Sequence, residues 1–512
     1  MQATVEVGQA LPPANRMFES RIGRRKRLPH RNHWWEVNAV YPIAIMKNLV
    51  TALFLCCALA LAQSHPAVAI HNAKIVTVSG PVLNKGTVVV RNGLIEAVGE
   101  NVAVPPDAML VEGEGLIVYP GLIDALSTWG QPGAAPAATV TAGRGGRGTT
   151  TPPTPTPTPT PPAAAATPAA TPSRGPQDRP QTTSWVKIAD EVSISDHRIE
   201  TARDAGFTTA VTFPTRGIFA GQGAVIDLVT AEKSGEMIVA SPAGQYISMT
   251  RGGFGGGMGG SFPGSLMGYI AYVRQIYLDA EHYKLVKDAY AKNPVGMTRP
   301  AYDRALEGVL DSPRILLPAN RLVEIDRMLR LAADLKQPVI LYGGREAFRP
   351  EAAALLKKFN VPVLLSLRWP EAPRDADPDE PDSLRTLETR DKAAGAPAVL
   401  EQAGVRFAFY SDGLDAARDL ERAVKKALDN GLSREAALRA LTLSPAEIYG
   451  VADRLGSIEA GKIGNLVVTR GDIFDDRTKV EMILVDGRKY VPAPEVAPTG
   501  GRSAATDVPG VQ

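Results

Sequence analysis

The chain has 512 residues, of which 44% are hydrophobic and 21% are charged. This composition is typical of a globular protein with a sizeable core, and the length allows two or three domains. Residues 1–62 carry 8 Lys and Arg against 3 Asp and Glu, so the formal net charge of +2 becomes −3 for the chain that follows them. Such a charge gives no electrostatic reason to expect a nucleic-acid partner or an anionic membrane surface.

The first segment reads as a targeting sequence. Residues 46–62, MKNLVTALFLCCALALA, have a short basic start, an apolar run too short to span a bilayer comfortably, and an Ala-Leu-Ala end that fits a cleavage site. We interpret them as a signal peptide of a secreted or periplasmic protein, and residues 1–45 as an over-extended start. A long basic leader and a signal-anchor are the alternatives. Cys56 and Cys57 both lie inside this segment, so the mature chain has no thiol for a disulfide, a metal or a nucleophile.

Short β-strands are predicted at both ends of the mature chain. Residues 66–119 contain β-branched runs such as AKIVTV and GTVVVRNGLIEAVG, with Asn92-Gly93 as a two-residue hairpin turn. Residues 454–492 return to the same pattern, with Asp486-Gly487 as a second hairpin signal. Both regions are therefore expected to be rich in β-strands.

Two segments have compositions that cannot build a core. Residues 131–181 include TTTPPTPTPTPTPPAAAATPAATP, in which proline removes backbone donors and apolar content is slight. We predict a disordered or polyproline-like insertion there. The tail 493–512 is rich in Pro, Ala, Gly and Thr and is expected to be disordered as well.

Between them, residues 120–453 alternate between helix and strand signals. Segments such as RLVEIDRMLRLAADL followed by QPVILYG, and EAAALLKKF followed by VPVLLSL, indicate βαβ units and a parallel sheet. The predicted fold class is therefore α/β, a TIM-type (β/α)8 barrel with one large insertion, between the two strand-rich regions.

Several stretches resemble the amidohydrolase superfamily. NAKIVTV, VRNGLIEAVG and VYPGLIDA look like its small β domain and its passage into the first barrel strand, and SREAALRALTLSPAEIYGVADRLGSIEAGKIGNLVV looks like its C-terminal passage. The resemblance implies that residues 66–119 and 454–492 form one small β-sandwich domain built from both chain ends. The nearest-looking branch is the imidazolonepropionase-like one. The resemblance implies one or two divalent metal ions at the C-terminal mouth of the barrel, held by an HxH pair after strand 1, by later histidines, and by an aspartate that also takes a proton from water.

Most of these ligand positions carry other residues. Leu126 and Thr128 stand where the resemblance implies the HxH pair. Pro318 and Asn320 follow the strand RILLPA, and Tyr342 and Gly343 end the strand VILYG, where further ligands would be expected.

The mature chain has only four histidines, His65, His71, His197 and His282, and none of them follows a predicted barrel strand. We expect a solvated or locally hydrogen-bonded role for each of them.

Asp412, in SDG after the strand VRFAFY, matches the catalytic aspartate that the resemblance implies, as a base or a vestige of one. A turn residue is the alternative. A catalytic zinc ion takes about three protein ligands, so Asp412 alone cannot hold one. Oxygen ligands for magnesium or manganese could come from Asp227, Asp415 or Asp124, although Asp124 belongs to the PGLIDA turn and is expected to be structural.

The glycine-rich run 252–260 lacks the Lys-Ser/Thr of a phosphate loop and is interpreted as a loop over the barrel mouth. Tyr246, Arg251, Phe254 and Met258 are candidates to line a pocket beside it.

Three functions remain. The favoured interpretation is a secreted amidohydrolase-fold protein without a metal site, which acts as a binding or partner subunit, beside an active paralogue or with a small-molecule ligand, and needs no cofactor. The first alternative is a hydrolase of non-peptide carbon–nitrogen bonds with an atypical zinc, manganese or magnesium site and Asp412 as base. The second is a surface protein that interacts through its Pro/Thr arm.

Overall fold

The computed structural model describes residues 67–131, 179–249, 263–373, 381–475 and 478–492. The proposed signal peptide, most of the Pro/Thr insertion and the C-terminal tail lie outside these residues, so those predictions stay predictions. Among the helices of the described part, none is both long and apolar enough to cross a bilayer.

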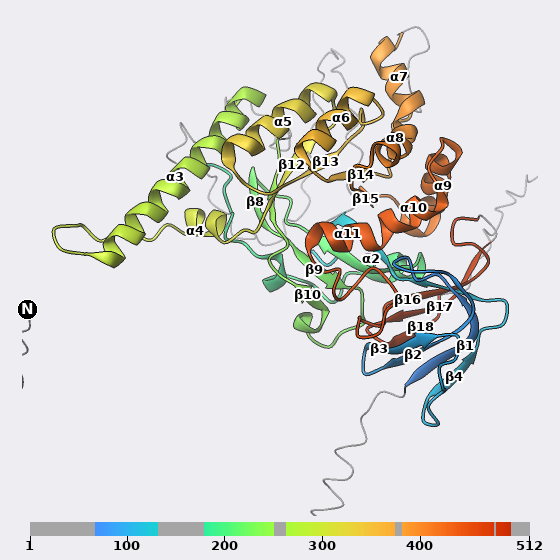
Figure 1. Cartoon of the computed structure of the whole chain (residues 1–512). Helices are drawn as coiled ribbons and strands as arrows, with labels where there is room; N and C mark the ends of the chain where they lie inside the picture. The colour runs from blue at the N-terminus through green and yellow to red at the C-terminus, as the bar shows by residue number, and fades with distance from the viewer. Residues whose placement is uncertain (1–66, 132–178, 250–262, 374–380, 476–477, 493–512) are drawn as a thin grey trace, which may run out of the picture. The chain divides into compact units, whose positions relative to one another are not determined.

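One eight-stranded sheet is built from both ends of the described chain (Figure 1). Its order is β18-β17-β16-β5-β1-β2-β3, with β4 beside β1. The strands are β1 (Val68–Ile75), β2 (Leu83–Arg91), β3 (Leu94–Gly99), β4 (Met109–Glu112), β5 (Ile117–Pro120), β16 (Leu466–Arg470), β17 (Lys479–Val485) and β18 (Arg488–Tyr490). The two ends meet where β16 pairs antiparallel with β5.

Both predicted hairpins of this sheet are confirmed. Asn92 and Gly93 join β2 to β3, and Asp486 and Gly487 join β17 to β18. All four residues have positive φ angles, between 50° and 81°, as a type I′ turn requires. The sheet encloses its own apolar core, to which both chain ends contribute, for example Ile75 of β1 and Leu484 of β17.

The remaining strands form the wall of a barrel-type α/β fold. They are β6 (Leu122–Ser127), β7 (Phe207–Thr212), β8 (Phe219–Gln222), β9 (Ala224–Asp227), β10 (Ile238–Ala240), β11 (Gln245–Ile247), β12 (Ile315–Ala319), β13 (Val339–Gly343), β14 (Val363–Ser366) and β15 (Phe407–Tyr410). One sheet has the order β10-β9-β7-β6 and the other β15-β14-β13-β12-β11-β8.

Gly223 joins the two sheets, because it links β8 of one directly to β9 of the other. A side chain at this position would place its Cβ 2.3 Å from the ring of Phe213, so only glycine lets the backbone pass so close to the ring. At the opposite seam β15 contacts β6, and no strand pairing joins them in the described structure.

The expected uniform parallel barrel is therefore confirmed only in its coarser form, an α/β barrel-type fold with a second domain. Both sheets are mixed, since β9 runs antiparallel to β7 and to β10, and β8 antiparallel to β11. Parallel neighbours need a crossover connection of a dozen or more residues. Residues 213–218 and 228–237 are too short for that and hold only the 3-10 helix η3 (Ser234–Met237), so the chain turns back on itself here.

Alternate strand residues fill the interior of this wall, for example Ile123, Val211, Leu316, Ile340 and Leu364. The helices pack outside (Figure 1). They are α2 (Arg198–Asp204), α3 (Leu266–Lys292), α4 (Arg304–Leu310), α5 (Leu322–Leu335), α6 (Pro350–Phe359), α7 (Leu384–Lys392), α8 (Ala396–Ala403), α9 (Ala416–Asp429), α10 (Arg434–Leu441) and α11 (Leu443–Tyr449), with the 3-10 turns η2 (Ile188–Asp190) and η4 (Ala393–Gly395).

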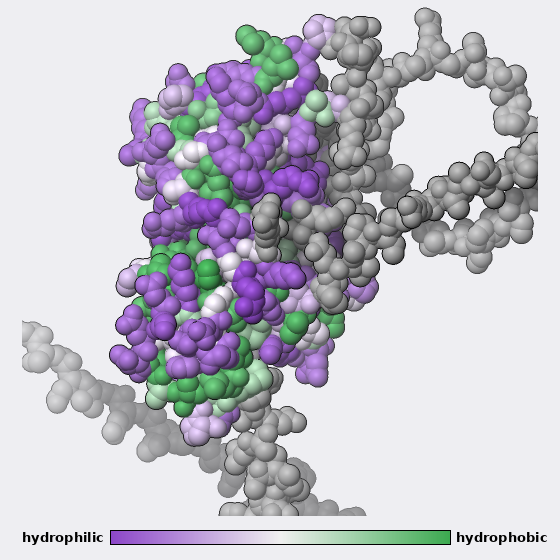
Figure 2. Space-filling model, turned by 90° about the vertical axis from the view of Figure 1, so that its right-hand side faces the viewer, coloured by the Kyte–Doolittle hydropathy of each residue, from purple (hydrophilic) through white to green (hydrophobic). Residues whose placement is uncertain are grey.

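Helix α11 sends its last side chain into the barrel. The hydroxyl of Tyr449 donates to the carbonyl oxygen of Ala125 in β6 at 2.7 Å, and its ring lies 6.2 Å from that of Phe213. On the face shown in Figure 2, hydrophobic residues form small groups among larger hydrophilic areas, as on most folded protein surfaces.

Candidate functional site

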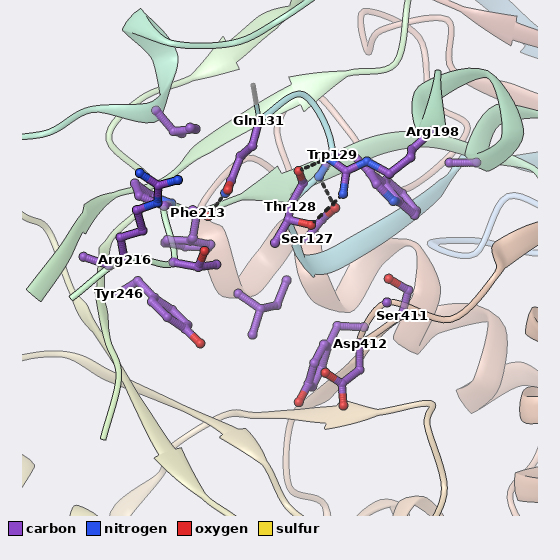
Figure 3. A pocket seen from close by; sticks show the side chains of 18 of the residues that line it. Ser127, Thr128, Trp129, Gln131, Arg198, Phe213, Arg216, Tyr246, Ser411 and Asp412 are labelled. Carbon is purple, nitrogen blue, oxygen red and sulfur yellow. Dashed lines mark hydrogen bonds between the residues drawn. The ribbon is translucent and has the colours of Figure 1, made fainter. Parts of the chain in front are cut away.

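A cavity of about 1200 Å³ opens where the carboxyl ends of the barrel strands meet. Residues at or just after the ends of β6, β7, β11, β13 and β15 contribute to its wall. The carboxyl ends of parallel strands are the usual place for a site in folds of this kind. Figure 3 shows Thr128, Tyr246 and Asp412 around this cavity.

Leu126 and Thr128, the two residues at the expected HxH positions, both line the cavity. The backbone N–H of Leu126 donates to Asp124 Oδ1 at 3.3 Å. Arg198 holds Thr128 by donating to its hydroxyl at 3.1 Å and to its carbonyl oxygen at 2.7 Å. The positions therefore face the mouth as the resemblance implies, but they offer an isobutyl group and a hydroxyl that is already engaged.

The second expected ligand position is corrected by one residue. Tyr342 lines the cavity, whereas Gly343 does not. Gly343 has a φ of 109°, and a Cβ there would lie 2.4 Å from Asn320 Oδ1, so a side chain at this position would be strained. Pro318 and Asn320 do not line the cavity either.

Three tyrosines occupy the mouth. Tyr246, Tyr342 and Tyr410 line it from β11, β13 and β15. The rings of Tyr246 and Tyr342 stack with centroids 5.1 Å apart, and the ring of Phe213 lies 5.9 Å from that of Tyr246. Burial raises the pKa of all three phenols, and the nearby charge of Asp412 raises it further. They are therefore neutral at physiological pH.

Of these tyrosines, the sequence singled out Tyr246 as a candidate pocket residue, and Tyr246 lines the cavity. Tyr410 was missed, although its place two residues before Asp412 at the end of a predicted strand was a usable signal. Arg251, Phe254 and Met258, the other three pocket candidates, lie outside the described residues.

Asp412 lines the cavity from the turn after β15. Its φ of 52° is in the left-handed region, which Asp and Asn tolerate better than most residues. The hydroxyl of Ser366, at the end of β14, donates to Asp412 Oδ2 at 2.7 Å. The residue is thus both a turn residue and a carboxylate of the mouth, and Asp415 lines the same cavity.

Asp124 is not a turn residue, as we had expected, but lies within strand β6 and is fully buried. The N–H and the hydroxyl of Ser411 donate to its two carboxylate oxygens at 3.1 and 2.5 Å. These bonds join β6 to the residue after β15 across the seam where strand pairing is missing. Burial raises the pKa of Asp124 to about 7.

Asp227 is corrected as a candidate metal ligand, because it does not line the cavity. It is buried in β9, where Oδ1 accepts hydrogen bonds from the Thr209 hydroxyl and the Asn465 amide, both at 2.8 Å. Asn465 precedes β16, so this carboxyl links the barrel wall to the β domain. Burial raises its pKa to about 7 as well.

The three histidines that the structure describes lie away from the cavity. His71 is exposed on β1 and its Nδ1 is 2.8 Å from the Thr87 hydroxyl. His197 is exposed at the start of α2, and His282 is exposed within α3. Their expected local roles fit these positions.

The donor set of the mouth does not fit a divalent metal ion. Within the described ranges, no three His, Cys, Asp or Glu side chains converge in a way that could hold a metal. Of the segments left out between residues 131 and 478, only 374–380 is rich in carboxylates, and none contains histidine or cysteine. Leucine, threonine and high-pKa tyrosines are poor ligands for zinc, which prefers imidazole, thiolate and carboxylate.

Known proteins resemble this chain in sequence and in fold. A profile described as "Amidohydrolase family" matches residues 378–489. An adenine deaminase of Moorella thermoacetica is 33% identical over 92 residues, which cover 18% of this chain and only 14% of that protein. The crystal structure of an amidohydrolase from Thermotoga maritima MSB8 is similar with a TM-score of 0.63 and 25% identity, covering 82% of this chain and 99% of that one. In its C-terminal sequence and in its fold, the chain is therefore similar to members of the amidohydrolase superfamily.

Proposed function

We propose that this amidohydrolase-superfamily protein binds a small molecule at its barrel mouth without a catalytic divalent metal ion, and acts as a non-catalytic binding or partner subunit in a secreted or periplasmic setting. The observation that carries the proposal is the identity of the residues facing the mouth. Members of the superfamily usually use divalent metals, but Leu126, Thr128 and Tyr342 face the mouth here.

The site keeps what ligand binding needs. Pockets for small molecules are concave and mostly apolar, with a few polar groups that fix orientation. The cavity combines Leu126, Trp129 and Phe213 with the hydroxyls of the tyrosines and the carboxylate of Asp412. An active paralogue is the partner that such a subunit would accompany.

Metal stoichiometry tests this proposal directly. The mature chain from Gln63 is incubated with zinc, manganese or magnesium, desalted, and measured by elemental analysis. We expect less than about a tenth of an equivalent of each metal, because about three ligands are needed to hold a catalytic zinc ion. Close to one equivalent, lost in Asp412→Asn, would refute it.

The second candidate function is hydrolysis of non-peptide carbon–nitrogen bonds with Asp412 as the base. It is favoured by the place of this carboxylate in the cavity wall and by its hydrogen bond from Ser366. Under this reading Asp412→Asn abolishes turnover of a cyclic amide, with Glu191→Gln, at the exposed rim, as the matched control. Equal turnover in both variants would exclude Asp412 as base.

A further inference from the structure

The carboxylate of Asp412 has no counter-charge in direct contact with it in the described structure, although the guanidinium of Arg368 lies nearby and donates to the carbonyl oxygen of Gly413. It accepts one hydrogen bond, from Ser366 to Oδ2, and no Lys or Arg side chain of the described residues forms an ion pair with it. A carboxylate can accept about four hydrogen bonds. Asp412 therefore presents a carboxylate with open acceptor positions to the cavity, and Figure 3 shows it on the same cavity wall as Ser411.

The two cationic side chains of the cavity wall do not supply that counter-charge. Arg198 donates to both carboxylate oxygens of Asp196, with its shortest contact at 2.7 Å, and to Thr128. Its charge is compensated by Asp196. Arg216 is exposed, and so is Glu191, an acidic residue of the same wall. Water screens the opposite charges of these two exposed residues. The electrostatic potential deeper in the cavity is therefore set by the negative charge of Asp412.

The walls beside Asp412 are aromatic. Tyr246, Tyr342 and Tyr410 line the cavity with it, and Figure 3 shows Tyr246 pointing into the cavity. Aromatic rings carry negative charge on their faces and attract cations such as ammonium groups, best where water is excluded. A carboxylate next to tyrosines is thus suited to a cation that has N–H donors, and it disfavours an anion.

The other residues that line the cavity determine which organic group this cation would carry. Leu126 and Trp129 line the cavity with apolar side chains, and the Trp129 ring packs edge-on against Phe207 at 5.3 Å, which fixes its position. A hydrated metal ion would gain nothing from these groups. We infer that the barrel mouth binds an organic ammonium ion with a compact apolar or aromatic body, its nitrogen at Asp412 and its body against Leu126 and Trp129. The inference rests on the proposed function, since it names the class of ligand for the same cavity.

Benzylammonium is a suitable probe, and benzyl alcohol is its neutral counterpart of nearly equal shape. Binding of each to the mature chain is measured by ligand-observed NMR titration near pH 7. We expect benzylammonium to bind at least about tenfold more tightly than benzyl alcohol, because hydrogen bonds to charged groups are the stronger ones. Asp412→Asn is expected to weaken benzylammonium by about 10- to 100-fold and to leave benzyl alcohol unchanged within about twofold.

Asparagine suits the left-handed backbone at residue 412, so this variant is expected to fold. Asp453→Asn removes the same charge from an exposed side chain that does not line the cavity, and it is expected to change benzylammonium affinity less than about twofold. If benzyl alcohol binds as tightly as benzylammonium, or if Asp412→Asn leaves benzylammonium affinity unchanged, the ammonium assignment is wrong while the ligand cavity stands. If neither probe binds, the ammonium assignment is also wrong. The metal measurement described above decides separately whether the site is metal-free.

Discussion

Replacing Asp124 by asparagine tests whether the seam of the barrel is joined by a neutral carboxyl. The pKa of Asp124 is raised from 3.8 to about 7 by burial, so the folded state binds this proton more tightly than the unfolded chain. The stabilisation is complete below pH 4 and is lost as the pH rises to 7. A shift of about 3 pKa units corresponds to roughly 4 kcal/mol, of which about 3 kcal/mol is lost between pH 5 and pH 8.

Asparagine has the shape of the protonated carboxyl and can keep its hydrogen bonds. Its amide oxygen can accept from the N–H groups of Ser411 and Leu126, and its amide nitrogen can donate to the Ser411 hydroxyl, which rotates to accept. We therefore expect Asp124→Asn to match the wild type within about 1 kcal/mol at pH 5 and to exceed it by about 3 kcal/mol at pH 8. The pKa of Asp227 is also raised to about 7. Between pH 5 and pH 8 the variant is therefore still expected to lose about half as much free energy of unfolding as the wild type loses.

The assay is urea unfolding at pH 5 and pH 8, followed by circular dichroism. Asp453→Asn is the matched control, because the Asp453 side chain is 74% exposed, and we expect changes within about 0.5 kcal/mol at both pH values. Glu459, whose pKa is lowered to about 2, titrates below this range. If Asp124→Asn loses more than about 2 kcal/mol at both pH values, the seam depends on an ionised carboxylate and the reasoning is wrong.

Three further predictions address the joints of the fold and the N-terminus. Asn465→Ala removes a donor to the buried Asp227 and is expected to cost about 1.5–3 kcal/mol, more at pH 8 than at pH 5; equal losses at the two pH values in urea unfolding would contradict this. Gly223→Ala places a methyl group against the Phe213 ring and is expected to cost about 1–3 kcal/mol, part of which Phe213→Leu restores in the double variant; a neutral single variant would contradict the account of this bend. N-terminal mass spectrometry of the exported protein is expected to find a chain beginning at Gln63, and a chain that retains residues 46–62 would show that the segment is not cleaved.

Local signals in the sequence were sufficient for much of the fold. Asn92-Gly93 and Asp486-Gly487 predicted both hairpins, because a two-residue turn depends on the φ preference of its own residues. The helical segments RLVEIDRMLRLAADL and EAAALLKKF correspond to α5 and α6. The reversal at β8 and β9 was missed, because strand direction depends on the length of the connections and on pairing with distant strands, and residues 213–237 contain no pattern that records it.

The candidate site was predictable where it depends on position within a strand, and not where it depends on contacts between distant segments. Leu126 and Thr128 could be placed at the mouth because the resemblance implies the HxH positions at the end of the first barrel strand, and β6 ends at Ser127. The role of Asp124 could not, since its partner Ser411 lies 287 residues further along the chain. Asp227 was misplaced for the same reason, because its partner Asn465 belongs to the C-terminal part of the β domain.

Under the proposed function, these two buried carboxyl groups would let the fold persist without metal ligands. A metal ion bound only by the folded state adds its binding energy to folding, so a fold that depended on it would be weakened by the loss of its histidines. Here Asp124 joins the first and last strands of the wall and Asp227 joins the wall to the β domain, and neither requires an ion. The volume at the mouth is occupied in part by the stacked rings of Tyr246 and Tyr342 and by Phe213. Stability and the chemistry of the mouth are therefore carried by different residues, which leaves Asp412 and the tyrosines available to recognise a ligand.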